Sequence, residues 1–78
     1  MLQSDARLLR IFGRSVQRAR KRLEIPQEML AERAHLSRNY VSDIERGVRN
    51  PGLVVVVRLA RALKLPLSDL LSEIEEEQ

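Results

Sequence analysis

The sequence PQEMLAERAHLSRNYVSDIERGVRNP, residues 26–51, is the most informative part of this chain of 78 residues. It predicts two short helices joined by a tight turn. Proline is tolerated at or beside the first position of a helix, so Pro26 predicts a helix over about 27–34. After the turn, Ser37 is a typical N-cap residue for a second helix over about 37–46. Gly47 then ends this helix, because glycine readily adopts the left-handed conformation found there.

Apolar periodicity predicts three further helices around this pair. One runs from about Ser4 to Leu23, and its core stripe recurs every three or four residues: Leu9, Phe12, Val16, Ala19 and Leu23. Another covers about 53–64, although four consecutive valines there favour a strand by propensity alone. However, the apolar residues also follow helical spacing, which predicts a helix whose inward-facing residues are Leu53, Val56, Leu59, Ala60 and Leu63. A last helix begins near Pro66. The prediction is a compact all-α domain of five helices, spanning 1–78.

Composition excludes several classes of protein. The chain has no cysteine and one histidine, so neither a disulfide framework nor a conventional metal site is expected, and we expect no cofactor. The longest apolar run, residues 53–57, is far shorter than the roughly 20 residues that span a bilayer. Arginines interrupt the apolar stretches near the N-terminus, so no secretory signal is expected. A cytoplasmic protein that does not contact membranes, associated with the nucleoid, is the expectation.

Charge is unevenly distributed along the chain. Residues 1–52 carry eleven Lys and Arg against six Asp and Glu, whereas residues 53–78 carry three against five. A basic body with an acidic tail suits a surface that meets phosphates and a far end that does not. A merely solvated helical surface explains the same charges equally well.

The string from Pro26 to Gly47, continued by residues 48–51, resembles the Cro/phage-repressor (Xre-like) helix-turn-helix family. The resemblance extends from about Phe12 to Leu71. In its short form the chain is also similar to the controller proteins of restriction–modification systems, which are small dimeric regulators. The resemblance implies a lambda-repressor-like domain whose second and third helices, about 26–46, form the helix-turn-helix. It also implies that the recognition helix, about 37–46, enters the major groove of double-stranded DNA.

Four residues match the family's base-reading positions: Arg38, Asn39, Ser42 and Asp43. Arginine offers a fork that fits guanine O6 and N7, and asparagine can bond adenine N6 and N7. Asp43 has two interpretations: it accepts a hydrogen bond from cytosine N4, or it orients Arg46. The second is favoured.

The resemblance assigns other residues to the DNA backbone or to the framework. Those expected at the backbone are Gln27, Ser37, Tyr40, Arg46, Arg49 and Asn50. Tyr40 is equally compatible with packing on the second helix. Arg20 matches an arginine that pairs with the glutamate at Glu45 and so ties the first helix to the third. His35 stands where the family commonly has glycine, which predicts positive φ in that turn, and Glu24 replaces a common helix-ending glycine.

An apolar strip remains after the core positions are assigned, and its members are Val54, Val55, Val57, Leu67, Leu71 and Ile74. An additional strip on so small a domain predicts an isologous homodimer through a region over about 53–75. The alternative is that these residues complete a thin core. The leading functional hypothesis is a sequence-specific transcription regulator, not an enzyme, that binds a palindromic operator. Its rival is an antitoxin or adaptor that uses the same fold to bind an unknown protein partner.

Overall fold

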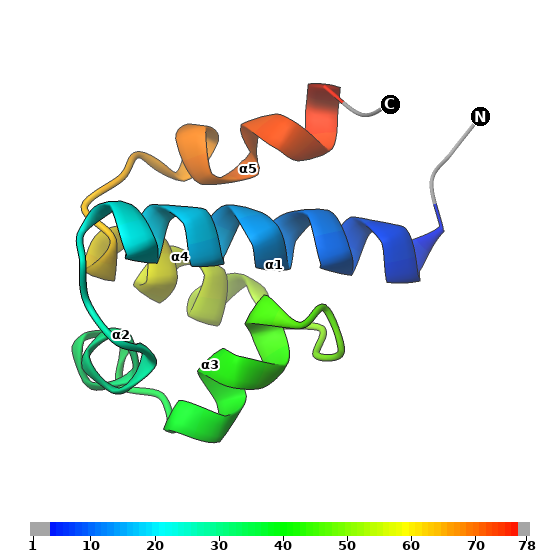
Figure 1. Cartoon of the computed structure of the whole chain (residues 1–78). Helices are drawn as coiled ribbons and strands as arrows, with labels where there is room; N and C mark the ends of the chain where they lie inside the picture. Colours follow the sequence, from blue (N-terminus) through cyan, green and yellow to red (C-terminus); the bar gives the residue numbers. More distant parts are fainter. Residues whose placement is uncertain (1–3, 77–78) are drawn as a thin grey trace.

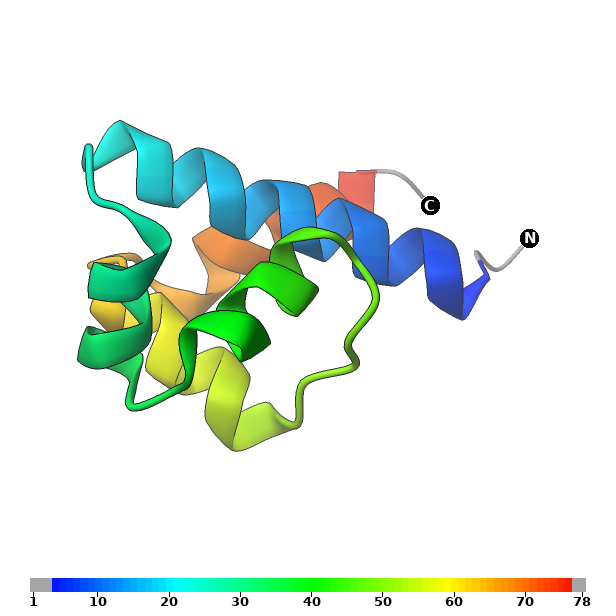
Figure 2. The same ribbon diagram turned by 60° about the horizontal axis from the view of Figure 1, so that its bottom comes forward.

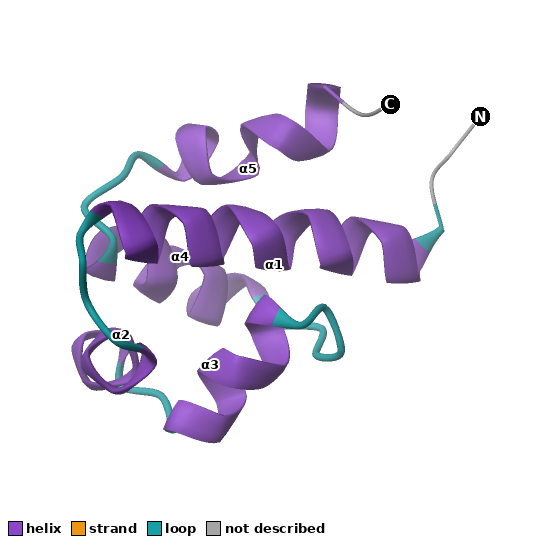
Figure 3. Cartoon of the chain, in the orientation of Figure 1, coloured by secondary structure: helices purple, strands orange, loops and turns teal. Residues whose placement is uncertain are grey.

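A computed structural model describes residues 4–76, and helices and loops make up all of this described part (Figure 3). The helices are α1 (Asp5–Arg22), α2 (Gln27–Ala34), α3 (Arg38–Glu45), α4 (Leu53–Ala62) and α5 (Leu67–Glu76). The prediction of five helices is confirmed, and the valine run is helical. Residues 1–3 and 77–78 of the predicted domain 1–78 lie outside the described residues.

The long helix α1 runs through the middle of the molecule, with α5 on one side and α2 and α3 on the other (Figure 1). Turning the molecule brings α4 forward, where the extended α3–α4 loop leads into it (Figure 2). The core lies between these helices, and its largest fully buried side chains are Ile11, Leu30, Ile44, Leu59, Leu70, Val16 and Val41. Every helix contributes at least one of them, so no helix is an appendage to the fold.

Four helices end in the same way, with one left-handed residue followed by an apolar residue. The left-handed residues are Glu24, His35, Gly47 and Lys64. In each case the following amide donates to a carbonyl five residues back, as from Leu36 to Ala31 at 2.8 Å and from Leu65 to Ala60 at 2.9 Å. The positive φ predicted at His35 is confirmed, and Glu24, which replaces a common helix-ending glycine, also has positive φ, whereas residue type did not predict it at Lys64. These closures fix the turn angles on both sides of α2.

Two core expectations were wrong, and one core residue was missed. Leu53 is predicted to face inward, yet it is 74% exposed. Leu23, at the end of the predicted stripe, is also exposed, whereas Ile11 is buried although the predicted stripe omits it. In a run such as 53–57 every position is apolar, so spacing cannot fix the rotation of the helix. That rotation is fixed by Leu59 and Leu63, which are buried further along the chain.

Candidate nucleic-acid interface

One side of α3 is anchored in the core. Val41 and Ile44 are fully buried in one cluster with Leu30 and Ala31 of α2. At the start of the helix, the Ser37 hydroxyl accepts a hydrogen bond from the Tyr40 amide at 3.1 Å. This satisfies one of the amides that a helix start otherwise leaves without a partner. The anchoring fixes both the position and the rotation of α3.

The opposite side of α3 faces solvent and carries the four predicted base-reading residues. Arg38 and Asn39 are exposed in the first turn, and Ser42 and Asp43 are half-buried one turn further along. Residues three and four apart share a helix face, so Asn39, Ser42 and Asp43 form one polar strip. An exposed helix start rich in hydrogen-bond donors is suited to a groove lined with acceptors.

A buried ion pair joins α1 to the end of α3. Arg20 Nε donates to Glu45 Oε2 at 2.7 Å, and its Nη2 donates to Oε1 at 2.9 Å. The Arg20 and Glu45 side chains are only 11% and 1% exposed. The hydrogen bond to Glu45 and the attraction of its charge raise the pKa of Arg20, although burial opposes them. The two hydrogen bonds from Arg20 hold the pair closed.

Two further hydrogen bonds extend this pair into a network. Gln27 Nε2 donates to Glu45 Oε1 at 3.1 Å, and Arg20 Nη1 donates to the Ile25 carbonyl at 2.9 Å. Residue types could not indicate the Ile25 contact, because every residue has a backbone carbonyl. Through these bonds the α1–α2 turn, the start of α2 and the end of α3 are held as one unit.

The cations around the end of α3 also have partners on that helix. Arg46 Nη2 donates to Asp43 Oδ1 at 2.6 Å, as expected if Asp43 orients Arg46. The Arg49 guanidinium lies 4.4 Å from the centre of the Tyr40 ring, in cation–π geometry. The Tyr40 ring itself is half-buried and packs against the core. Asn50 is exposed in the loop beyond them.

Gly13 has no role predicted from the sequence, although it controls how closely α1 approaches α3. A Cβ built there would overlap the carbonyl oxygen of Ile44. It would also lie 2.8 Å from the carbonyl oxygen of Glu45. An isolated glycine inside a helical pattern is itself a signal, because it weakens the helix without local benefit. The close approach of the two backbones explains why this glycine is present.

Gly13→Ala is expected to destabilise the domain by about 1–3 kcal/mol, because α3 must shift away from α1 to accommodate the methyl group. The helix propensity of alanine offsets only about 1 kcal/mol of this cost. Urea unfolding followed by circular dichroism measures the change. Gly52→Ala is the control for steric overlap, since no atom beyond its chain neighbours lies within 4 Å of a Cβ built there; as the N-cap of α4 it should lose only the modest preference of a cap for glycine over alanine. Equal or greater stability of Gly13→Ala would contradict the close approach.

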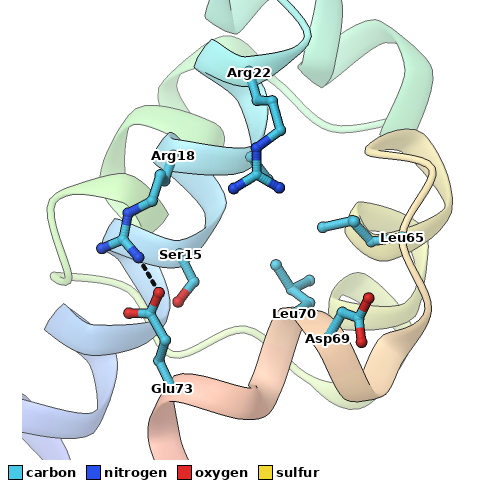
Figure 4. A pocket seen from close by; sticks show the side chains of 8 residues that line it. Ser15, Arg18, Arg22, Leu65, Asp69, Leu70 and Glu73 are labelled. Carbon is cyan, nitrogen blue, oxygen red and sulfur yellow. Dashed lines mark hydrogen bonds and ion pairs between the residues drawn. The ribbon is translucent and has the colours of Figure 1, made fainter.

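The side of α1 that faces away from α3 packs against α5 and borders a small pocket. The pocket, of about 100 Å³, lies between α1 and α5. Figure 4 shows its lining side chains, among which Arg18 pairs with Glu73. Ser15 lines this pocket, but its hydroxyl donates to the Ile11 carbonyl at 3.2 Å and is thus engaged within α1. His35, the single histidine of the chain, lies in the α2–α3 turn and does not line the pocket. The ion pair between Arg18 and Glu73 bridges α1 and α5 but is exposed, so it adds little to the packing of Leu70 that holds α5 in the core.

Metal ligands do not gather anywhere in residues 4–76: this part of the chain holds no cluster of three His, Cys, Asp or Glu residues that could bind a metal ion. Among the helices of the same range, none has the length and apolar character needed to cross a bilayer.

The segment that contains α2 and α3 matches a known protein family. The helix-turn-helix model HTH_3 matches residues 16–70, a range that includes α2, α3 and the loop after them. The chain belongs to the HTH_3 helix-turn-helix family. It is therefore a helix-turn-helix DNA-binding regulator of the Xre-like type, in which α2 and α3 form the motif, and the family is not one of enzymes.

Relatives and solved structures agree with this membership. The immunity repressor protein of Bacillus phage phi105 is 41% identical over 69 residues, which are 85% of this chain and 48% of that protein. The chain thus spans about half the length of this relative. The control protein C.MunI of Mycoplasma is 39% identical over 67 residues, covering 85% of this chain and 90% of that protein.

Among solved structures, the restriction–modification controller protein C.AhdI from Aeromonas hydrophila is 39% identical and superposes with a TM-score of 0.78. The match covers 80% of this chain and 94% of that one. The compact five-helix, lambda-repressor-like fold is therefore confirmed.

Proposed function

We propose that this regulator binds a palindromic operator as a homodimer, with one recognition helix of each subunit in the major groove. A single observation supports this most strongly. The helix α3 buries Val41, Ile44 and Glu45 while it presents Arg38 and Asn39 to solvent. A helix held so firmly by one side can offer the other to base edges without losing stability. Bound in this way, the protein resides with the DNA in the cytoplasm.

The residues assigned to the DNA backbone surround this helix. Gln27 and Ser37 stand at the N-termini of α2 and α3, where free amides and the helix dipole favour a phosphate. Tyr40 and Arg49 lie together, while Arg46 and Asn50 lie at the end of α3 and in the loop beyond it. Phosphate contacts on both sides of the base-reading residues would set the register of α3 in the groove.

The dimer is proposed because apolar side chains are exposed on α4. Val54 is 64% exposed beside Leu53, whereas Val55 and Val57 are half-buried. The other predicted interface residues, Leu67, Leu71 and Ile74, are half-buried and pack against the core of their own subunit. The start of α4 therefore offers the freest apolar surface for a second copy. Two-fold symmetry would place the recognition helices about 34 Å apart, one turn of DNA.

Selection of preferred duplexes from a random pool by the purified protein tests this proposal. The expected product is an inverted repeat whose half-site centres lie about 10 base pairs apart. A single unrepeated site, together with a monomer in sedimentation at tens of micromolar, would overturn the dimer. A pool without enrichment would overturn sequence-specific binding and favour the protein-interaction role.

The base-reading assignment predicts different outcomes for two classes of variant. Arg38→Ala and Asn39→Ala should each erode discrimination at one or two positions per half-site, by about 1–3 kcal/mol for each bidentate hydrogen-bonded pair that is removed. Arg49→Ala should weaken binding to all sequences alike, because phosphates carry no sequence information. Binding measured on a panel of single-base variants of the selected duplex separates the two patterns. If Arg38→Ala leaves the preferred sequence unchanged, Arg38 does not read a base.

A further inference from the structure

The ion pair between Asp43 and Arg46 lies on the part of α3 that faces solvent. Its two side chains are 33% and 63% exposed, in contrast to the buried pair formed by Arg20 and Glu45. Exposed pairs of this kind contribute little or nothing to the stability of a fold. The pair therefore needs another explanation than holding α3 in place.

Asp43 is also an unfavourable residue for a surface that meets DNA. It lies one helical turn after Asn39 on the same face, so a docked α3 would bring its carboxylate near the phosphates. In the free protein this charge is compensated by Arg46 at 2.6 Å. The same contact engages Nη2 of Arg46, and the nearby carboxylate offsets the charge with which this guanidinium would attract a phosphate. While the pair is closed, the repulsion of phosphates by Asp43 and their attraction by Arg46 largely cancel.

We propose that Asp43 determines specificity by exchanging its partner on the correct DNA sequence; this inference rests on the proposed function. On DNA of arbitrary sequence the pair stays closed and Arg46 contributes no phosphate contact. At a site that presents cytosine N4 to Asp43, the amino group replaces the guanidinium as hydrogen-bond donor to the carboxylate. Arg46 is then free to bind a phosphate. The additional phosphate contact forms only on the sequence that presents the cytosine. Affinity for this sequence is therefore higher than for others, and this difference is specificity.

The exchange predicts how Asp43→Asn changes the salt dependence of binding. Each phosphate contact steepens the slope of log K against log salt by about 0.9, so freeing Arg46 in both subunits should steepen the nonspecific slope by about 1.8. The drop in nonspecific affinity between 50 and 200 mM salt should thus grow by roughly tenfold. Asp43→Ala, which removes the acceptor altogether, should lose the preference for cytosine at one position per half-site.

The experiment measures these slopes by fluorescence anisotropy on the selected duplex and on a scrambled duplex. Glu75→Gln is the matched control, because it removes one exposed negative charge on α5, across α1 from α3 (Figure 1). Its nonspecific slope should equal that of the parent protein. Asp43→Asn should steepen this slope in the parent protein but not in the Arg46→Ala background. Unfolding midpoints of Asp43→Asn and the parent protein should agree, which separates the effect from a loss of folding.

Two results would overturn the exchange. The first is a nonspecific salt slope of Asp43→Asn that equals the slope of Glu75→Gln, or a steepening by Asp43→Asn that is just as large in the Arg46→Ala background. The second is an unchanged cytosine preference in Asp43→Ala, whose side chain has no acceptor. If instead the parent protein selects no sequence at all, the proposed function fails. The salt slopes on the scrambled duplex still show whether Asp43 keeps Arg46 from binding a phosphate.

Discussion

Glu45→Ala is expected to lower the free energy of unfolding by about 3–5 kcal/mol, because it leaves the largely buried guanidinium of Arg20 without its partner. The Gln27 amide loses its acceptor in the same change. Small domains are stable by only about 5–15 kcal/mol in total, so this variant should be partly unfolded at moderate temperature. Urea unfolding at neutral pH, followed by circular dichroism, gives the difference.

A second ion pair on the same helix supplies the control. Asp43→Ala also removes a carboxylate paired with an arginine, but this pair is exposed, so a decrease of about 0–1 kcal/mol is expected. The contrast isolates burial as the cause, since both variants shorten an acidic side chain of α3 to alanine. Similar decreases in the two variants would show that the pair between Arg20 and Glu45 does not lock α3 to α1.

The helices and the motif could be predicted because local signals agreed with one another. Pro26, Ser37 and Gly47 mark helix boundaries through their own backbone preferences, and these do not depend on the rest of the fold. The observed bounds of α2 match the predicted ones, and Ser37 does cap α3. The orientation of Asp43 toward Arg46 was also accessible, since residues three apart on a helix are neighbours.

What could not be predicted depends on contacts between helices. The rotation of α4 is set by how Leu59 packs against other helices, so the exposure of Leu53 was hidden in a uniformly apolar run. Gly13 matters only because the end of α3 crosses α1 at that point. The network around Glu45 likewise needs the α1–α2 turn to deliver the Ile25 carbonyl. Sequence spacing describes one helix at a time and is silent about such crossings.

The largest functional effect is expected from salt. With Arg38 engaged at a base edge, Arg46 and Arg49 of two subunits would bring four guanidinium groups against the phosphates of the selected duplex. About 0.9 counterion is released per neutralised phosphate, so the slope of log K against log salt should be near −3.6. Affinity should therefore fall by roughly a hundredfold or more between 50 and 200 mM salt. Titrations by fluorescence anisotropy at four or more salt concentrations measure the slope.

The same titrations on a scrambled duplex test how the arginines are used. If Arg46 is held by Asp43 on arbitrary DNA and Arg38 stays in the groove away from the phosphates, Arg49 of each subunit is the arginine left to bind them and the slope should be near −1.8. Specific binding would then be more salt-sensitive than nonspecific binding, so discrimination should narrow as salt rises. A specific slope shallower than about −1 would mean that the arginines at the end of α3 do not neutralise phosphates, and that another surface of the domain contacts the DNA.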